Sequence, residues 1–574
     1  MDRASFLRKK QRTFLPADFK VTGWDSLKSY YENLLEREIH SVEDLRQWFK
    51  DRSELESVVD EDAAWRYIRM TCDTNDKEKL DAFTFYVNEI EPKIAPYADK
   101  LNRKAVNCPY LDQLKSKPGF DIAARLMKKE IQIFREANVP LKAEIQTEAQ
   151  KYNAIAGAMT IAHDGKELTL QQGAALLEEQ DRGLRKEIFM KISARRLRDR
   201  AALDELFDRL IRLRHQTALN ADFKNYRDYM FAALGRMDYT PEDCFAFHNS
   251  IEQEAVPLLD ALSKERLEKL GYDRLKPWDK SVDISGKPPL KPFRTAGELV
   301  EKTIACFNRL DPFFGDCLSD MKNRGFLDLD SRKGKAPGGY NYPLSETGAP
   351  FIFMNSSATF RDMVTMVHEG GHAVHSYLMD CLELNIFRQT PSEVAELASM
   401  SMELLSMEHW DIFFENEEDL KRARREQLEQ IVGTLPWVAA IDKFQHWIYE
   451  NPDHTAEERT EVWNDVYRRF SDKVVDWTGQ EDIRSALWQK QLHLYEVPFY
   501  YIEYGIAQLG ALAIWKNYKE NPSKALEGYM EALKLGYTRP IPEIYAAAGI
   551  QFNFNREYIR ELIEFLRNEL YKVK

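Results

Sequence analysis

Two histidines of this sequence, His368 and His372, lie four residues apart with Glu-Gly-Gly between them. Residues at this spacing lie one turn apart on the same face of an α-helix and can offer two imidazole nitrogens to one metal ion. Apolar residues recur at helical spacing from 360 to 379, and Thr359 with Asp362 has the pattern of a capping box. The sequence therefore predicts an α-helix over this range that carries both histidines.

Between the two histidines, Glu369 is placed to reach a water molecule on the metal, whereas Gly370 and Gly371 are unusual in a helix interior. Each glycine costs about 0.8–1 kcal/mol relative to alanine there. We therefore expect another segment to pass close to this helix, either as ordinary tight packing or to give room to a metal and a neighbouring helix. Two histidines with an intervening glutamate indicate metal-dependent hydrolysis.

A catalytic zinc usually takes three protein ligands and leaves a fourth position for water, so one more ligand is expected. His375 shares the helix face of His372 but lies about 4.5 Å further along the axis. Three ligands along one helix cannot converge on one ion, so we interpret His375 as a supporting or packing residue. The remaining candidates are carboxylates: Glu383, Glu393, Glu396 and Glu403.

The sequence from Thr390 to Glu393 separates these candidates. It has the pattern of a helix start, with Thr390 at the N-cap and Pro391 at the first helical position, which gives Glu393 a capping role. Glu396 then lies one turn into the helix, and Glu403 follows seven residues later on the same face. We predict Glu396 as the third ligand and Glu403 as an outer carboxylate that fixes a metal-bound imidazole. A solvated helix face is the alternative for each glutamate.

A second group of candidate residues lies in an aromatic segment near the C-terminus. His493, Tyr500 and Tyr504 are seven and four residues apart, which on an uninterrupted helix places them near one line, although Pro498 falls between them. Amide hydrolysis develops negative charge on the carbonyl oxygen, which imidazole or phenol donors can stabilise. One or both tyrosines are therefore predicted donors. A buried aromatic helix explains the same pattern, and Tyr501 stays open as a further donor.

Three stretches together resemble the thimet oligopeptidase and oligoendopeptidase F family of zinc metallopeptidases, and most closely its bacterial oligoendopeptidase branch: His368–His372, Ala395–Ser399 and Pro498–Tyr504. Gly338–Asn341 and Pro350–Asn355 are similar to a loop and a strand that lie beside the substrate in that family. The resemblance implies a mainly α fold. It would be a two-lobed, all-helical zincin metallopeptidase with a deep central channel and small β elements beside the zinc helix.

The resemblance also implies roles for individual residues, with one Zn²⁺ per chain and Glu369 as the general base. The implied metal ligands are His368, His372 and Glu396. The implied transition-state group is His493, Tyr500 and Tyr504. One stretch departs from the family pattern, because Tyr495–Pro498 stands where the thimet branch has a glycine-rich loop.

The activity that follows is that of a zinc-dependent endopeptidase, which hydrolyses internal peptide bonds of oligopeptides by metal-activated water. A zinc carboxypeptidase or dipeptidase of related helical fold is the alternative, and it would need a cation to hold the free carboxylate of its substrate. The candidates for that cation are Arg361, Arg388 and Lys490. A peptide-binding protein without the chemistry is a further class, which the intact Glu369 argues against.

At 574 residues the chain exceeds the size at which single cores stop growing. We expect an N-terminal helical lobe over 1–200 and a catalytic helical lobe over 201–574. Three segments interrupt the helical pattern: a β-hairpin around Asp164-Gly165, a long loop over 271–292 that crosses between the lobes, and a strand over 350–355. If that strand is an edge strand, it could pair with an extended peptide backbone.

The net charge of −13 argues against a nucleic-acid partner, which would favour a basic surface. The N-terminus lacks the apolar run of a signal peptide, and no uncharged apolar stretch approaches membrane-spanning length. We therefore predict a cytoplasmic protein with oligopeptide substrates and no membrane partner, as a monomer or small homo-oligomer.

Overall fold

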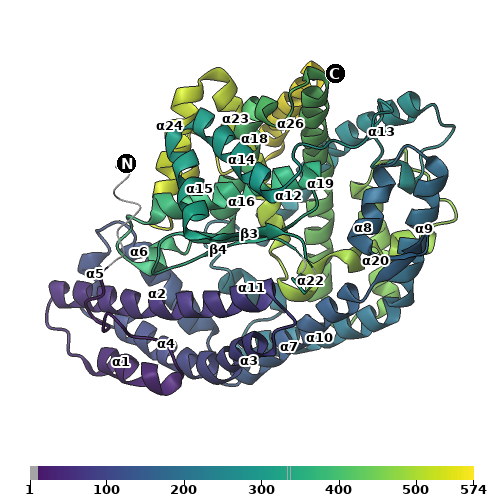
Figure 1. Ribbon diagram of the computed structural model, residues 1–574. Coiled ribbons are helices and arrows are strands. Elements are labelled where there is room, and N and C mark those ends of the chain that lie inside the picture. The colour runs from purple at the N-terminus through teal and green to yellow at the C-terminus, as the bar shows by residue number, and fades with distance from the viewer. Residues whose placement is uncertain (1–10, 333, 337, 574) are drawn as a thin grey trace.

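A computed structural model describes residues 11–332, 334–336 and 338–573, and its fold is mainly α-helical, as predicted (Figure 1). The N-terminal helices, purple and blue at the base of Figure 1, are α1 (Trp24–Glu36), α2 (Val42–Cys72), α3 (Lys77–Phe85), α4 (Glu91–Val106), α5 (Leu111–Leu114), α6 (Phe120–Ile133) and α7 (Asn138–Gly157). The next helices are α8 (Leu170–Ala175), α9 (Arg182–Arg198), α10 (Arg200–Asn220), α11 (Tyr226–Ala233), α12 (Pro241–Glu254), α13 (Val256–Leu270), α14 (Ala296–Leu310) and α15 (Pro312–Arg324).

The C-terminal half holds the helices that carry the predicted site. They are α16 (Phe360–Met379), α17 (Asn385–Arg388), α18 (Ser392–Ser406), α19 (Glu417–Glu450), α20 (Ala456–Phe470), α21 (Glu481–Ser485), α22 (Leu492–Glu496), α23 (Tyr501–Glu520), α24 (Pro522–Lys534), α25 (Ile541–Ala547) and α26 (Arg556–Lys572). Helix α18 packs against both α16 and α23.

The strands form two small sheets. Strands β1 (Thr160–His163) and β2 (Lys166–Thr169) make the predicted hairpin, and Asp164 and Gly165 between them both have positive φ, as a two-residue hairpin turn requires. The second sheet has the order β3-β5-β4, from β3 (Leu327–Asp330), β5 (Pro350–Ser356) and β4 (Tyr340–Pro343). Both the hairpin and the strand over 350–355 are therefore confirmed.

The condition stated for substrate pairing at this strand is not met, because β5 is the central strand and not an edge strand. It pairs parallel to β3 and antiparallel to β4, so its backbone groups are used on both sides. The physical reason lies in its side chains, which are buried on both faces of the sheet. Phe351 and Phe353 pack with Ala64 and Ile68 of α2, while Ile352 and Met354 join the main core. A strand covered on both faces is the natural centre of a sheet.

The buried apolar side chains gather into a large main core and two smaller clusters. The main core runs from Ile133 to Leu570 and includes the buried faces of α16, α18 and α23. A second cluster is built from the helices before residue 134 and also takes in Leu384 and Phe387. Within the part of the chain that the structure describes, no helix combines the length and the apolar character that a bilayer-spanning segment needs.

Candidate metal centre and catalytic site

Helix α16 has the bounds that the sequence predicts. Its N-cap is Thr359, and the predicted capping box is present: Asp362 N–H donates to Thr359 Oγ1 at 3.2 Å, and Thr359 N–H donates to Asp362 Oδ2 at 2.9 Å. His368 and His372 project from one face of this helix, with their ring centroids 4.9 Å apart. Local sequence therefore fixes where both imidazoles lie.

Helix α18 approaches α16 closely at Gly371. A Cβ atom on Gly371 would lie 2.6 Å from Ser399 Cα, and one on Gly370 would lie 2.8 Å from the Phe307 ring. Only glycine leaves room for the α18 backbone at this distance. The expectation that another segment passes close to the two glycines is confirmed, and the close approach carries Glu396 towards the histidines.

Glu396 on α18 completes a group of three potential metal donors with His368 and His372. Its Oε2 atom lies 3.4 Å from His368 Nε2 and 3.8 Å from His372 Nε2. A tetrahedral ion with ligand bonds of about 2.0–2.1 Å places its ligand atoms about 3.4 Å apart, and zinc accepts both imidazole and carboxylate ligands. The three residues therefore fit a metal ion in spacing and in chemistry.

A second carboxylate, that of Glu403, contacts His368 at Nδ1, the ring nitrogen that does not face Glu396. Glu403 Oε1 lies 2.6 Å from His368 Nδ1, and its other oxygen accepts a hydrogen bond of 2.6 Å from Gln427 Nε2 on α19. This is the arrangement that fixes the tautomer and ring plane of a metal-bound histidine. The sequence placed Glu403 correctly, but Gln427 was missed because nothing local links α19 to this site.

The interpretation of Glu393 as a capping residue is wrong. The N-cap of α18 is Pro391 and not Thr390, and no side chain caps it. Glu393 is buried and accepts a hydrogen bond of 2.5 Å from Tyr239 Oη, with Arg236 Nε 3.9 Å away. A carboxylate that points into the protein needs such partners, so the buried arginine and phenol replace the expected capping contact.

The two other residues considered as ligands lie outside the donor group. Glu383 pairs at 3.0 Å with Arg46 of α2. His375 is buried on α16, and burial lowers its pKa to about 3. Its position agrees with the interpretation of a packing residue.

Electrostatics at the donor group favours a cation. Burial alone would raise the pKa of Glu396, but the hydrogen bond from His368 and the nearby imidazole charges lower it to about 2. Burial lowers the pKa of His372 to about 4. The pKa of His368 is raised well above its ordinary value despite burial, because the carboxylates of Glu396 and Glu403 both contact its ring. These two negative charges would equally attract a metal ion at this position.

Glu369 lies on α16 beside the donors and is almost fully buried. Burial raises the pKa of its carboxyl group to about 7, with Glu396 and Glu403 adding to the effect and His368 opposing it. The edge strand β4 packs beside this turn, since Asn341 Nδ2 donates to the Glu369 carbonyl at 3.1 Å. A carboxyl group with a pKa near neutrality can both accept and return a proton.

The predicted transition-state group comes together from α22 and α23. Tyr500 Oη donates to Glu396 Oε1 at 3.0 Å, and Tyr504 Oη lies 3.3 Å from His493 Nε2. The ring of Tyr501 lies 5.1 Å from that of His493. The chain between α22 and α23 is not helical, so these residues do not share one helix. Their approach depends on the turn at 497–500.

Comparison with known proteins gives matches along most of the chain. The sequence matches the profile of peptidase family M3 over residues 175–564, and that of the peptidase M3 N-terminal domain over residues 14–134. An oligoendopeptidase F homolog of Lactococcus lactis is 23% identical over 70% of this chain and 66% of its own length. One of Borreliella burgdorferi is 23% identical over 86% of this chain and 84% of its own.

A solved structure of Pz peptidase A with an inhibitor superposes with a TM-score of 0.91 at 27% sequence identity, over 98% of this chain and 99% of that one. The fold, the donor group and these matches define a metallopeptidase. The chain belongs to peptidase family M3, which confirms the resemblance found in the sequence and implies a metal ion at the site. The alignment spans about two thirds (66%) of the Lactococcus sequence.

Proposed function

We propose that this chain is a zinc endopeptidase that hydrolyses internal bonds of oligopeptides. The proposal rests on the short distances from Glu396 Oε2 to His368 Nε2, 3.4 Å, and to His372 Nε2, 3.8 Å. Glu369, which lies on the same helix as both histidines, is buried beside them. The ligands are His368, His372 and Glu396. When bound, zinc supplies Lewis-acid activation of a water molecule and of the substrate carbonyl.

The protein side chains supply the proton transfers and the remaining charge stabilisation. Glu369 accepts a proton from the attacking water and returns it to the leaving amine, which suits a carboxyl group whose pKa burial raises to about 7. Tyr500 or Tyr504, together with His493, donates a hydrogen bond to the carbonyl oxygen as it becomes negative. Burial lowers the pKa of His493 to about 4, so its ring acts as a neutral donor.

The test of this site is the pair of substitutions Glu369→Gln and His368→Ala. Glu369→Gln is expected to keep the metal and lose about 10²-fold or more in kcat, because it removes the base and leaves the ligands. His368→Ala is expected to lose the metal itself. Metal analysis and cleavage of a quenched peptide measure both, with Glu383→Gln as the matched surface control. Normal turnover by Glu369→Gln, or full metal content in His368→Ala, would contradict the assignment.

Endopeptidase action is proposed over the carboxypeptidase alternative because Arg388, one candidate for binding a substrate carboxylate, has other partners. Its guanidinium donates to the Ser345 carbonyl at 2.9 Å and to Ser57 Oγ at 3.4 Å. A peptide blocked at its C-terminus by amidation is therefore expected to be cut internally, as seen by mass spectrometry of the products. Cleavage restricted to the last residues of unblocked peptides would favour the alternative.

The strand β4 is the proposed place for the substrate backbone. It is an edge strand, and its Asn341 side chain reaches the backbone of Glu369. An extended peptide that added to this edge would bind through main-chain hydrogen bonds, which recognise peptides of varied sequence. This proposal replaces β5, whose backbone groups are already paired.

A further inference from the structure

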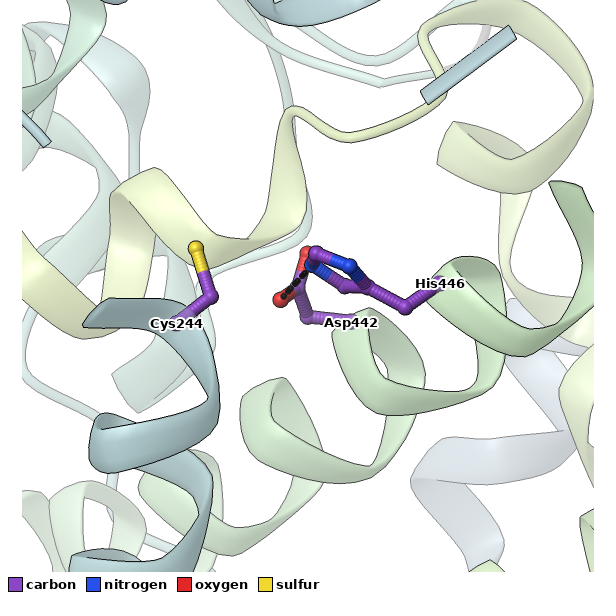
Figure 2. Close-up of side chains that lie close together, drawn as sticks. All are labelled: Cys244, Asp442 and His446. Atoms are coloured by element: carbon purple, nitrogen blue, oxygen red, sulfur yellow. Dashed lines mark ion pairs between the residues drawn. The ribbon is translucent and has the colours of Figure 1, made fainter. Parts of the chain in front are cut away.

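A second buried group of potential metal donors lies between α12 and α19. Cys244, Asp442 and His446 have one donor atom each within 4.8 Å of one another (Figure 2). Asp442 Oδ2, however, is already shared by two imidazoles, at 2.8 Å from His248 Nε2 and 3.3 Å from His446 Nε2. Burial raises the pKa of the Cys244 thiol well above its ordinary value, so it remains protonated. The hydrogen bond between His248 and Asp442 joins α12 to α19, and His446 adds a polar contact, so these residues form a small polar network.

The network ends at the turn between α22 and α23. The ring of His446 meets that of Phe499 edge to face, with centroids 5.4 Å apart and planes at 86°. The preceding residue on α19, Gln445, accepts the Phe499 N–H at 2.7 Å through its Oε1 atom. Both Gln445 and Phe499 are buried. Helix α19 thus holds the side chain and the backbone of one turn residue at the same time.

That residue has an unusual backbone conformation. Phe499 has a φ of 68°, in the left-handed region that bulky side chains avoid. Strained conformations of this kind persist only where the surroundings impose them, and they gather at functional sites. Here the next residue is Tyr500, at the N-cap of α23. The strain therefore lies directly before the two tyrosines of the proposed site.

The carbonyl of Phe499 is held from the other side by Arg236. This buried guanidinium donates to the Phe499 carbonyl through Nη2, and the same atom lies 2.9 Å from Glu503 Oε1 on α23. Its Nε lies 3.9 Å from Glu393 on α18, one turn before Glu396. Arg236 therefore joins the turn, the tyrosine helix and the helix that carries the third metal donor.

We propose that Gln445 and Arg236 are positioning residues, which together hold Phe499 in its left-handed conformation and so aim Tyr500 and Tyr504 at the metal centre. The inference rests on the proposed function in one respect, namely that the tyrosine hydroxyls act in catalysis. Neither residue touches the three metal donors. Both act through the backbone of a single turn.

The first experiment replaces Gln445 with methionine, which keeps the length of the side chain and removes the acceptor. Gln445→Met is expected to lower kcat by about 10- to 100-fold, the scale of a small displacement of catalytic groups. KM and metal content should stay unchanged, because the three metal donors lie on α16 and α18 and the substitution leaves the packing of these two helices in place. Hydrogen exchange should speed up at the Phe499 amide, which loses its acceptor.

A double-mutant cycle distinguishes a loss of tyrosine positioning from a general disturbance of the structure. In a background of Tyr500→Phe with Tyr504→Phe, the same Gln445→Met substitution should change kcat by less than about twofold, because the groups it orients are gone. An equal loss of kcat in both backgrounds would overturn the proposal, as would full kcat together with fast exchange at Phe499. If the two tyrosine variants alone keep full activity, the proposed catalytic role fails, and the exchange measurement still decides whether the turn is held.

Arg236→Lys is the second variant, in case Gln445→Met does not fold. It keeps the positive charge but loses the planar guanidinium, which presents Nη2 to Phe499 and Glu503 and Nε to Glu393. Its matched control is Arg185→Lys, since Arg185 is equally buried and donates to the Trp278 carbonyl at 3.0 Å, in a different network. A fall in kcat for Arg236→Lys alone supports the proposal, and equal falls in both variants oppose it. If the wild type binds a second metal ion that Cys244→Ser loses, then Cys244, Asp442 and His446 form a metal site, which contradicts their description as a polar network.

Discussion

Among single residues, Glu403 supports the proposed metal centre through one short contact with His368. Its carboxylate lies 2.6 Å from His368 Nδ1, and Gln427 fixes its other oxygen. Glu403→Gln is expected to weaken metal binding by about 10- to 100-fold, the usual effect of removing such a partner. Competition with a chelator measures the affinity, and Glu383→Gln is the control. An unchanged affinity would show that the contact does not orient the imidazole.

His375 gives a pH-dependent prediction. Burial lowers its pKa to about 3, against 6.5 as its ordinary value, so the unfolded chain takes up a proton at mildly acid pH and the folded chain does not. This stability is fully present above pH 6.5 and is lost as the pH falls towards 3. Between about pH 7.5 and about pH 5 the loss amounts to about 2 kcal/mol.

The substitution His375→Gln removes this titration and keeps a hydrogen-bond donor. We expect the free energy of unfolding of the wild type to fall by about 2 kcal/mol more than that of the variant between about pH 7.5 and about pH 5. Urea unfolding at the two pH values measures the difference. Parallel changes in the two proteins would mean that His375 titrates normally in the folded state.

At the element scale, the crossing of α16 and α18 depends on Gly371. An added Cβ would meet the backbone of α18, including Ser399 Cα at 2.6 Å, so Gly371→Ala should lower the free energy of unfolding by about 1–3 kcal/mol despite the better helix propensity of alanine. Gly433 on α19 is the matched control, because nothing lies within 4 Å of its Cβ position. Gly433→Ala should stabilise the protein by about 0.8–1 kcal/mol.

Denaturant unfolding of both glycine variants, with metal analysis of Gly371→Ala, tests this pair. The first variant should also bind metal more weakly, because the displaced α18 carries Glu396. Equal stabilisation by both substitutions would contradict the close approach of the two helices.

The elements that the sequence predicts well are those with local signals. Helix α16 follows from its capping box and apolar spacing, and the hairpin follows from Asp164-Gly165. The sheet order could not be predicted, because β5 becomes central through contacts with α2, almost 300 residues earlier in the chain. The same limit applies to Glu393 and Gln427, whose partners come from distant helices. The position of Glu396 near the histidines was predictable, because its heptad spacing to Glu403 survives a shift of the helix start by one residue.

At the scale of the whole molecule, the predicted boundary at residue 200 cuts through shared packing. The rings of Tyr152 and Tyr495 lie in contact, tilted by 30° with centroids 4.4 Å apart, and the Tyr152 hydroxyl donates to the Gln489 carbonyl at 3.0 Å. Phe120 likewise meets Phe387 at 5.3 Å. The cytoplasmic location and the oligomeric state stay predictions, as does the division into lobes over 1–200 and 201–574.

Two fragments test where the folding unit begins. A fragment of 201–574 loses α7 and α9, whose buried apolar residues belong to the main core. A fragment of 135–574 keeps them and exposes Leu344, Phe351 and Phe353 as well as Leu384 and Phe387. We expect the longer fragment to unfold cooperatively at a lower temperature than the full chain, and the shorter one to show no cooperative transition, because its core is incomplete. Calorimetry of both fragments and the full chain measures this. A single sharp transition for 201–574 at the midpoint of 135–574 would place the boundary at residue 200 after all.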